Sequence, residues 1–391
     1  MADARIEELW LYPVKGCRGV RVASARVTPA GLEHDRCWCI VDRDGVNVAA
    51  MEAISKRKMP SLATITVTLV AATPPSSGGG TYGDRVSAIE LSADGMEPLR
   101  LPTDEAAYAT EEDVRVECSG KSTTSGGGWS FGFIAGKAHA AGSAWVSAYL
   151  NRKADTQEGG IGDRLVSGKR KLSRYSLVRT LNNGLSMEAY PPIFPVIAKS
   201  KTVPEYKERF AGNYRQFSDF APFLLVNQQS ERFLASVAGL ESYPIASFRG
   251  NIVVRSDGAW EEEAWAVVDV CSPTSARATP ALTLRKIKEC PRCNVPCRDE
   301  LTGKFLFPDD SLKLWKVLKH VFPLKAGDPE WGNWAGVFFG VYFGHAGRAG
   351  GTVRVGDRLV VRQYADTRTG WPLVTKWLLT SVMVRLACAA L

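Results

Sequence analysis

The stretch of this chain best suited to chemistry is Cys290-Pro291-Arg292-Cys293. A cysteine binds a metal or attacks an electrophile as the thiolate, and nearby cations favour that charged form. Four cations lie within or close to this stretch: Lys286, Lys288, Arg292 and Arg298. The pattern therefore indicates one reactive thiolate in a basic environment.

Other uses of these cysteines stay open on spacing alone. A structural zinc site needs four Cys or His ligands in paired spacing. Cys297 could be a third ligand and Cys271 a distant fourth, but the nearest histidine downstream is His320. An iron-sulfur run would need a further Cys-x2-Cys step and a proline after its last cysteine, where this chain has Arg298. Buried, unreactive cysteines are a further alternative.

The histidines do not supply another enzyme motif. His34, His139, His320 and His345 are scattered, and none lies in an HExxH or nucleophile-elbow pattern. A Cys-His hydrolase would require residues that are distant in sequence to converge on folding, so it stays a minor alternative.

Six further segments accompany the cysteine pair in a fixed order. They are residues 11–19 (LYPVKGCRG), 31–38 (GLEHDRCW), 218–226 (SDFAPFLLV), 248–254 (FRGNIVV), 338–342 (FFGVY) and 353–357 (VRVGD). In this order and spacing the chain resembles the MOSC superfamily, and most closely the amidoxime-reducing components, which are molybdenum enzymes. The resemblance extends over about residues 5–361, and the combination is specific although each piece alone is weak.

The resemblance implies a molybdenum held by the dithiolene of a molybdopterin and by one protein cysteine, which carries over onto Cys293. The residues that hold the pterin and its phosphate carry over onto Lys15, Arg36, Arg249, Arg292 and Tyr342. Arg forks, Lys charge and a tyrosine hydroxyl are suitable donors for a buried phosphate.

The chain also departs from the family pattern. Gly16 follows Lys15 where the amidoxime reducers commonly carry serine, and Phe220 and Ala221 stand where small hydroxyl residues are expected before Pro222. These changes remove possible side-chain hydrogen bonds to the cofactor, so the backbone of Gly16 and its neighbours would have to provide them.

The function implied by the resemblance is reduction of N-hydroxylated substrates, such as amidoximes, hydroxylamines or N-hydroxylated bases, by oxygen removal at molybdenum. Electrons would come from a b-type haem cytochrome served by a flavin reductase. Cys293 would be both catalytic and the metal ligand, because soft sulfur donation tunes a metal potential. The alternative is a carrier that binds molybdenum cofactor, or passes sulfur to it, without reductase turnover.

Composition limits the partners and the compartment. With 391 residues and 45% hydrophobic content, the chain can form substantial cores, and its length favours two domains. The net charge of +8 suits an anionic cofactor or an acidic partner, and no nucleic-acid signature accompanies it. Nine cysteines without regular pairing, and no leader pattern in residues 1–8, predict a cytoplasmic protein. The largely apolar residues 371–391 leave a membrane-associated tail as the alternative.

Short β-branched and aromatic runs predict a β-rich α+β fold. Strands are expected at residues 6–14, 37–41, 63–70, 174–179, 252–254, 284–289 and 352–361, and helices at 138–152, 230–237 and 310–320. We expect an N-terminal MOSC-associated β-rich domain at 1–152, an inserted linker at 153–173, a barrel-like MOSC domain at 174–362 and a C-terminal extension at 363–391.

Overall fold

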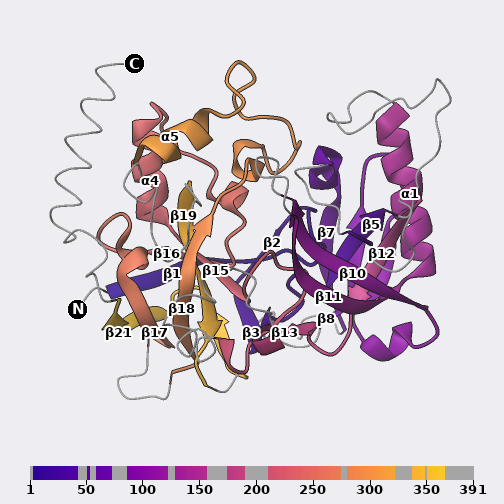
Figure 1. Cartoon of the computed structure of the whole chain (residues 1–391), viewed down its shortest axis with the longest axis horizontal. Helices are drawn as coiled ribbons and strands as arrows, with labels where there is room; N and C mark the ends of the chain where they lie inside the picture. Colours follow the sequence, from indigo (N-terminus) through magenta and orange to yellow (C-terminus); the bar gives the residue numbers. More distant parts are fainter. Residues whose placement is uncertain are drawn as a thin grey trace, which may run out of the picture.

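The structure is a computed structural model that describes residues 3–42, 51–52, 59–72, 86–121, 128–155, 174–189, 210–273, 280–321, 337–347 and 350–365. Two β-rich units lie side by side in it (Figure 1). Helices are few and cover the strands from outside, so the predicted β-rich α+β class is confirmed.

The first unit to consider is a closed barrel of seven strands. Its members are β1 (Asp3–Leu11), β15 (Phe223–Asn227), β16 (Ile252–Arg255), β17 (Trp265–Cys271), β18 (Leu282–Pro291), β19 (Phe338–His345) and β21 (Arg358–Tyr364). They pair in the order β16-β15-β19-β18-β17-β21-β1, and pairing of β1 with β16 closes the ring. The predicted barrel is therefore confirmed, and closure leaves it no open sheet edge.

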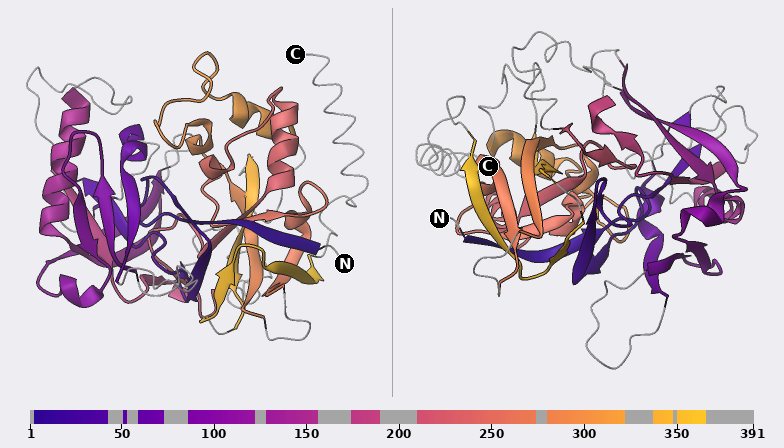
Figure 2. Two further views of the ribbon diagram at one scale, coloured as in Figure 1. Left: turned by 180° about the vertical axis from the view of Figure 1, so that it is seen from behind. Right: turned by 90° about the horizontal axis from the view of Figure 1, so that it is seen from below.

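The second unit is built mainly from the N-terminal half. Its five-stranded sheet contains β5 (Trp38–Asp42), β6 (Met51–Glu52), β10 (Glu112–Lys121), β11 (Gly128–Ala138) and β12 (Tyr175–Thr180). A three-stranded sheet of β7 (Thr66–Ala71), β8 (Val86–Ser92) and β9 (Leu99–Pro102) belongs to the same unit. The helix α1 (Ala140–Asp155) packs on β12 and stands at the outer side of this unit (Figure 2).

Each unit takes one strand from beyond the predicted boundary. The first strand, β1, completes the barrel of the C-terminal half, whereas β12 pairs with β5 and β11 of the N-terminal unit. Most of the predicted linker, residues 156–173, lies outside the described residues. The division of the chain at residues 153–173 stays a prediction.

Short strands and 3-10 turns connect the two units. The short strands are β2 (Val20–Val22), β3 (Ser24–Thr28), β4 (Gly31–Leu32), β13 (Leu185–Ser186), β14 (Tyr214–Arg215) and β20 (Thr352–Arg354). The single strand predicted at 352–361 is wrong, because a turn separates β20 from β21. Gly356 occupies that turn with a φ of 91°, a conformation that glycine adopts without steric cost.

Side chains alternate along the barrel strands and separate two cores. Leu225 and Val341 point into the barrel, whereas Leu224 and Tyr342 belong to a second cluster outside it. The helices α4 (Gln228–Val237) and α5 (Lys313–Val321) contribute to this outer cluster. Tyr342 is thereby placed on the outer surface of the barrel, beneath a covering layer.

Among the described residues, no helix has the length and apolar character needed to cross a membrane. The apolar segment 371–391, considered above as a membrane-associated tail, lies outside those residues.

Candidate functional site

One cluster gathers the side chains that the resemblance assigns to the cofactor: Lys15, Arg36, Arg249, Arg292 and Tyr342. Arg36 Nη2 donates to the carbonyl oxygen of Arg249 at 2.9 Å. Arg292 Nη2 donates to the carbonyl oxygen of Phe248, the residue before Arg249, at 2.7 Å. Segments more than 200 residues apart in sequence therefore meet at one place, on the barrel surface next to the N-terminal unit.

Tyr12 organises two of these arginines. The guanidinium carbons of Arg36 and Arg249 lie over its ring, 4.6 and 4.1 Å from the centroid, and the tyrosine is fully buried. A ring face attracts cations, and each arginine also has its own carboxylate. Arg36 Nη1 lies 2.6 Å from Asp35 Oδ2, and Arg249 Nη1 lies 3.1 Å from Glu300 Oε2. These contacts allow two like charges to remain close together.

Both arginines have an unusual backbone conformation. The φ angles of Arg36 and Arg249 are 51° and 56°, in the left-handed region. For a residue other than glycine this conformation costs on the order of 1–3 kcal/mol, and it persists only where surrounding contacts impose it. The Arg36 amide donates to the carbonyl of Tyr12, and the Arg249 amide donates to that of Ala246. At both positions, therefore, the surrounding contacts hold the arginine side chain in its direction in spite of the cost in backbone energy.

Lys15 reaches the same region from the turn after β1. Its Nζ donates to the carbonyl of Phe217 at 3.0 Å and lies 2.5 Å from Asp219 Oδ1. Lys15 lowers the pKa of Asp219 well below its usual value, and Arg36 adds to the effect, so this carboxylate is ionised. Gly16 is buried at a φ of 90°, which explains why this position tolerates glycine.

Arg292 is held at three points but keeps one donor unmatched. Its amide donates to the carbonyl of Val337 at 2.6 Å, Nη2 to Phe248, and Nη1 to the sulfur of Cys290 at 3.0 Å. Within the described part of the chain, its buried Nε has no hydrogen-bond partner. A buried donor without a partner is costly, so this atom is ready to bind an acceptor on a ligand.

Tyr342 lies opposite Lys288 in the pairing of β18 with β19. Burial raises the pKa of Tyr342 well above its usual value, so its hydroxyl is a neutral donor. Phe220 packs on Tyr342 with a centroid distance of 5.4 Å and lies 3.9 Å beneath the Lys288 ammonium. Burial lowers the pKa of Lys288 to about 8, and the nearby Cys290 and Glu289 oppose that change. Phe220 therefore supports a buried cation where a hydroxyl residue was expected.

Three cysteines lie at the end of β18 and in the short segment that follows it. Cys293 is exposed, whereas Cys290 and Cys297 are buried. Burial raises the pKa of the Cys297 thiol. Among the described residues there is no group of three or more Cys, His, Asp or Glu side chains that could hold a metal. Of these three sulfurs, that of Cys293 is the accessible one.

The cluster carries more buried positive than negative charge. Its cations are Lys15, Arg36, Arg215, Arg249, Lys288 and Arg292, and the carboxylates beside them in the described residues are Asp35, Asp219, Glu289 and Glu300. Arg215 and Lys288 are 1% and 4% exposed. Buried cations are stabilised by negative charge close to them, so an anion in this place would stabilise the folded protein. Together with the unmatched Nε of Arg292, this excess fits the pterin phosphate of a molybdenum cofactor.

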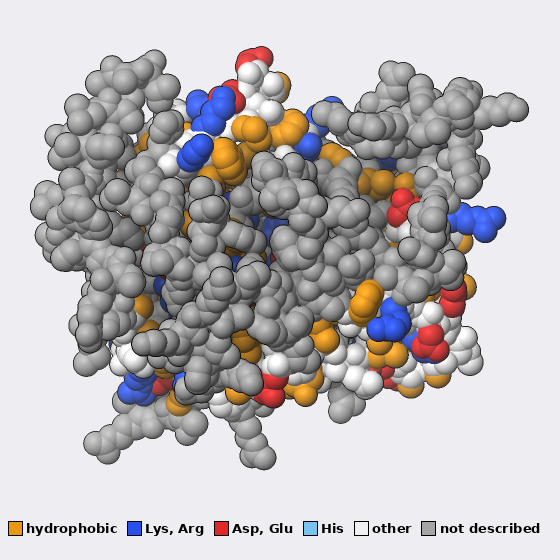
Figure 3. All heavy atoms as spheres, viewed as in Figure 1, with side chains coloured by type: hydrophobic (Ala, Val, Ile, Leu, Met, Phe, Trp, Pro, Cys, Tyr) orange, Lys and Arg blue, Asp and Glu red, His pale blue; other side chains and the backbone are white. Residues whose placement is uncertain are grey.

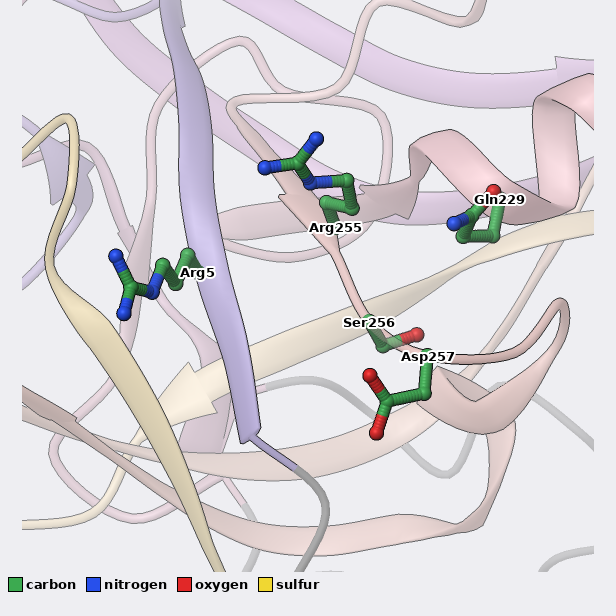
Figure 4. A pocket seen from close by; sticks show the side chains of 5 residues that line it. All are labelled: Arg5, Gln229, Arg255, Ser256 and Asp257. Atoms are coloured by element: carbon green, nitrogen blue, oxygen red, sulfur yellow. The ribbon is translucent and has the colours of Figure 1, made fainter.

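Figure 3 shows the described Lys and Arg side chains that are visible on one face of the molecule. There, Lys and Arg side chains stand dispersed among hydrophobic and acidic ones. A hollow elsewhere on the barrel is lined by Arg5, Arg255, Ser256, Asp257 and Gln229 (Figure 4). The guanidinium groups of its two arginines point in different directions and do not converge on a common point. Arg255 of this hollow is paired with Glu7, whose Oε1 lies 3.0 Å from its Nε.

Sequence reasoning missed several residues of the cluster. Tyr12 was considered only as part of the motif at residues 11–19. The signal that could have identified it is an aromatic residue three positions before Lys15. Glu300 and Asp219 carry no signal for their ion pairs, because their partners are distant in sequence. Lys288 was recognised as a nearby cation, but a polar residue in a strand gives no sign of being buried against Phe220.

Two family models match the chain. The MOSC N-terminal beta barrel domain matches residues 3–153, and the MOSC domain matches residues 213–360. Together they include every residue named above in the cluster.

Curated relatives agree with this result. The chain is 26% identical over 309 residues to mitochondrial amidoxime reducing component 2 of Bos taurus, covering 76% of this chain and 67% of the relative. It is 25% identical over 364 residues to the Rattus norvegicus protein of the same name, covering 90% and 81%. Molybdenum cofactor sulfurase of Homo sapiens is 22% identical over 300 residues, covering 76% of this chain but 27% of that protein. The chain belongs to the MOSC superfamily, with a MOSC N-terminal beta barrel domain followed by a MOSC domain.

Proposed function

We propose that this protein is a molybdenum-cofactor-dependent reductase of N-hydroxylated substrates, such as amidoximes, hydroxylamines or N-hydroxylated bases. The observation that carries the proposal is the exposed Cys293 beside a buried excess of cations. This combination suits a ligand that has both a metal and a phosphate. The relatives named amidoxime reducing components support the choice of substrate class.

The residues divide between the two ends of such a cofactor. Cys293 would hold the molybdenum, because a thiolate is a soft ligand. Lys15, Arg36, Arg249 and Arg292 would hold the molybdopterin and its phosphate, and the backbone of Gly16 and the hydroxyl of Tyr342 would add neutral donors. When bound, the cofactor supplies the two-electron chemistry that removes oxygen from an N–O bond.

The protein's own groups prepare the site for that chemistry. Ion pairs with Asp35 and Glu300 fix the two arginines over Tyr12 before any ligand arrives. Preorganised donors lose less freedom on binding, which favours affinity for the anionic part of the cofactor. Exposure of Cys293 leaves the metal end open to substrate, whereas the phosphate end is buried.

The proposed partners are a b-type haem cytochrome and the flavin reductase that serves it, which would return electrons one at a time. The overall basic charge would favour encounter with an acidic donor, and the rate of reduction should then fall as salt increases. We further propose a cytoplasmic location, with no nucleic-acid partner.

The test begins with protein purified from a host that makes molybdopterin. We expect about one molybdenum and one pterin per chain, as one ligand cysteine implies, and turnover of benzamidoxime with a reduced donor. Protein that contains zinc or iron but no molybdenum would disprove the cofactor assignment. Protein that contains molybdenum but is inactive on every N-hydroxylated substrate would disprove the reaction.

A second candidate is a molybdenum-cofactor carrier or sulfur-transfer protein. The similarity to molybdenum cofactor sulfurase favours it, although this chain spans about a quarter of that relative. A carrier would bind the cofactor and release it to an apo-enzyme, but it would not oxidise a reduced donor in the presence of benzamidoxime. These two measurements on the same preparation separate the candidates.

A further inference from the structure

The sulfur of Cys290 interacts with two of the side chains that the proposed function assigns to the cofactor. Arg292 Nη1 donates to it at 3.0 Å, and Cys290 is one of the neighbours that raise the pKa of Tyr342, after burial itself. Cys290 is 2% exposed, so a ligand or solvent has little access to its sulfur. The residue is therefore placed to act on the site through its neighbours.

The position of Cys290 follows from the irregular end of β18. The pairing of β18 with β19 shifts between Glu289 and Pro291, and the next residues leave the sheet. Such an irregularity re-aims a side chain relative to the strand that carries it. Here Cys290 lies in the outer core with Tyr342, and Arg292 turns back to reach the same sulfur.

Among the described residues, Cys290 is the acceptor that Arg292 Nη1 uses. The other terminal nitrogen of Arg292 is bound to the carbonyl of Phe248, and its Nε has no partner in the described residues. Loss of the sulfur would leave Nη1 of a buried guanidinium without an acceptor, and the group would turn to find one. The donor that faces a ligand would then change direction.

We propose that Cys290 is a positioning residue, whose sulfur fixes the Arg292 guanidinium in the orientation that binds the anionic part of the cofactor. This inference rests on the proposed function. It gives the first cysteine of the Cys290–Cys293 pair a role distinct from that of the second, since Cys293 is exposed and would hold the metal.

Three variants separate orientation from packing. Cys290→Ala removes the acceptor, Cys290→Ser keeps one of nearly the same size, and Cys297→Ala removes another buried thiol of the same core. Pterin content per chain is measured by fluorescence after oxidation, during dialysis at increasing salt. We expect Cys290→Ala to lose pterin about tenfold faster than wild type, the factor for one charged hydrogen bond. Cys290→Ser and Cys297→Ala should stay close to wild type.

A second measurement does not depend on the cofactor. Cofactor-free protein is treated with phenylglyoxal, and modification of Arg292 is followed by peptide mass spectrometry. A freed guanidinium should react several-fold faster in Cys290→Ala than in wild type, Cys290→Ser or Cys297→Ala. Thermal unfolding of all variants shows whether the fold is retained.

The results distinguish two kinds of failure. Wild-type protein that contains no pterin would contradict the proposed function, and the phenylglyoxal rates would still decide the role of Cys290. Equal Arg292 reactivity in Cys290→Ala and wild type would overturn the positioning role. Equal pterin loss from Cys290→Ser and Cys290→Ala would overturn it as well, because packing alone would then account for the defect.

Discussion

Replacement of Lys288 by methionine should make the cofactor-free protein more stable at pH 7. The ammonium is 4% exposed, and burial lowers the pKa of Lys288 from 10.5 to about 8. A difference of this size corresponds to about 3 kcal/mol of unfavourable free energy in the folded state. The cation–π contact with Phe220 is lost in the variant, which offsets about 0.5–2 kcal/mol of the gain. A net stabilisation of about 1–3 kcal/mol remains.

The dependence on pH has a definite sign. Because the folded pKa lies below the unfolded one, the native state releases its proton first as pH rises. The cost of the buried charge is complete below pH 8, declines between about 8 and 10.5, and is absent above that range. The advantage of Lys288→Met over wild type should therefore be largest at pH 7 and vanish near pH 10.5.

Urea unfolding of wild type and variant at several pH values measures this effect. Lys286→Met is the matched control, because Lys286 lies on the same strand but is 2.9 Å from Glu289 Oε1 and donates to the carbonyl of Glu263. Its loss leaves those groups unpaired and should not stabilise the protein. A lower stability of Lys288→Met at pH 7, or a difference from wild type that stays constant up to pH 10.5, would refute the reasoning.

Three other outcomes follow from the same cluster and from the barrel. Arg249→Ala should weaken cofactor retention by about 2–5 kcal/mol. Arg255→Ala should have little effect, because Arg255 is exposed and lies outside the cluster, and equal pterin content in the two variants would reject the assignment. Cys293→Ala should abolish benzamidoxime turnover per bound molybdenum while Cys297→Ala keeps most of it, and the reverse result would move the metal ligand to Cys297. Burial raises the pKa of Glu262 from 4.5 to about 7. The contribution of Glu262 to wild-type stability should therefore fall by about 3 kcal/mol as pH rises from 4.5 through 7. Denaturant titrations of Glu262→Gln at several pH values should lack that fall.

The sequence was sufficient for the features that depend on local order. Runs of β-branched and aromatic residues identified β5, β7, β12, β16 and β18, because a strand is recognised by its own alternation and its flanking turns. The segments around Lys15, Arg249 and Cys293 identified the family, since residue type and spacing are properties of the chain itself.

The order of the strands in the sheets could not be predicted from the sequence, because pairing joins segments that are far apart in the chain. Nothing in residues 3–11 indicates that they close a barrel whose other strands begin at Phe223. The strand at Tyr175–Thr180 was expected to open the second domain, yet it pairs with the N-terminal sheet. Closure removes free edges from the barrel, and this gain exists only once the whole ring is formed.

The site divides in the same way. The sequence alone determined that a thiol, several cations and a tyrosine were available and in which order they occur. Only the tertiary structure decided that two arginines share the ring of Tyr12, that Lys288 is buried on Phe220, and that the sulfur of Cys290 lies against Arg292. Burial and charge pairing depend on neighbours brought in from other segments, and these neighbours are fixed by packing of the folded chain, not by adjacency in the sequence.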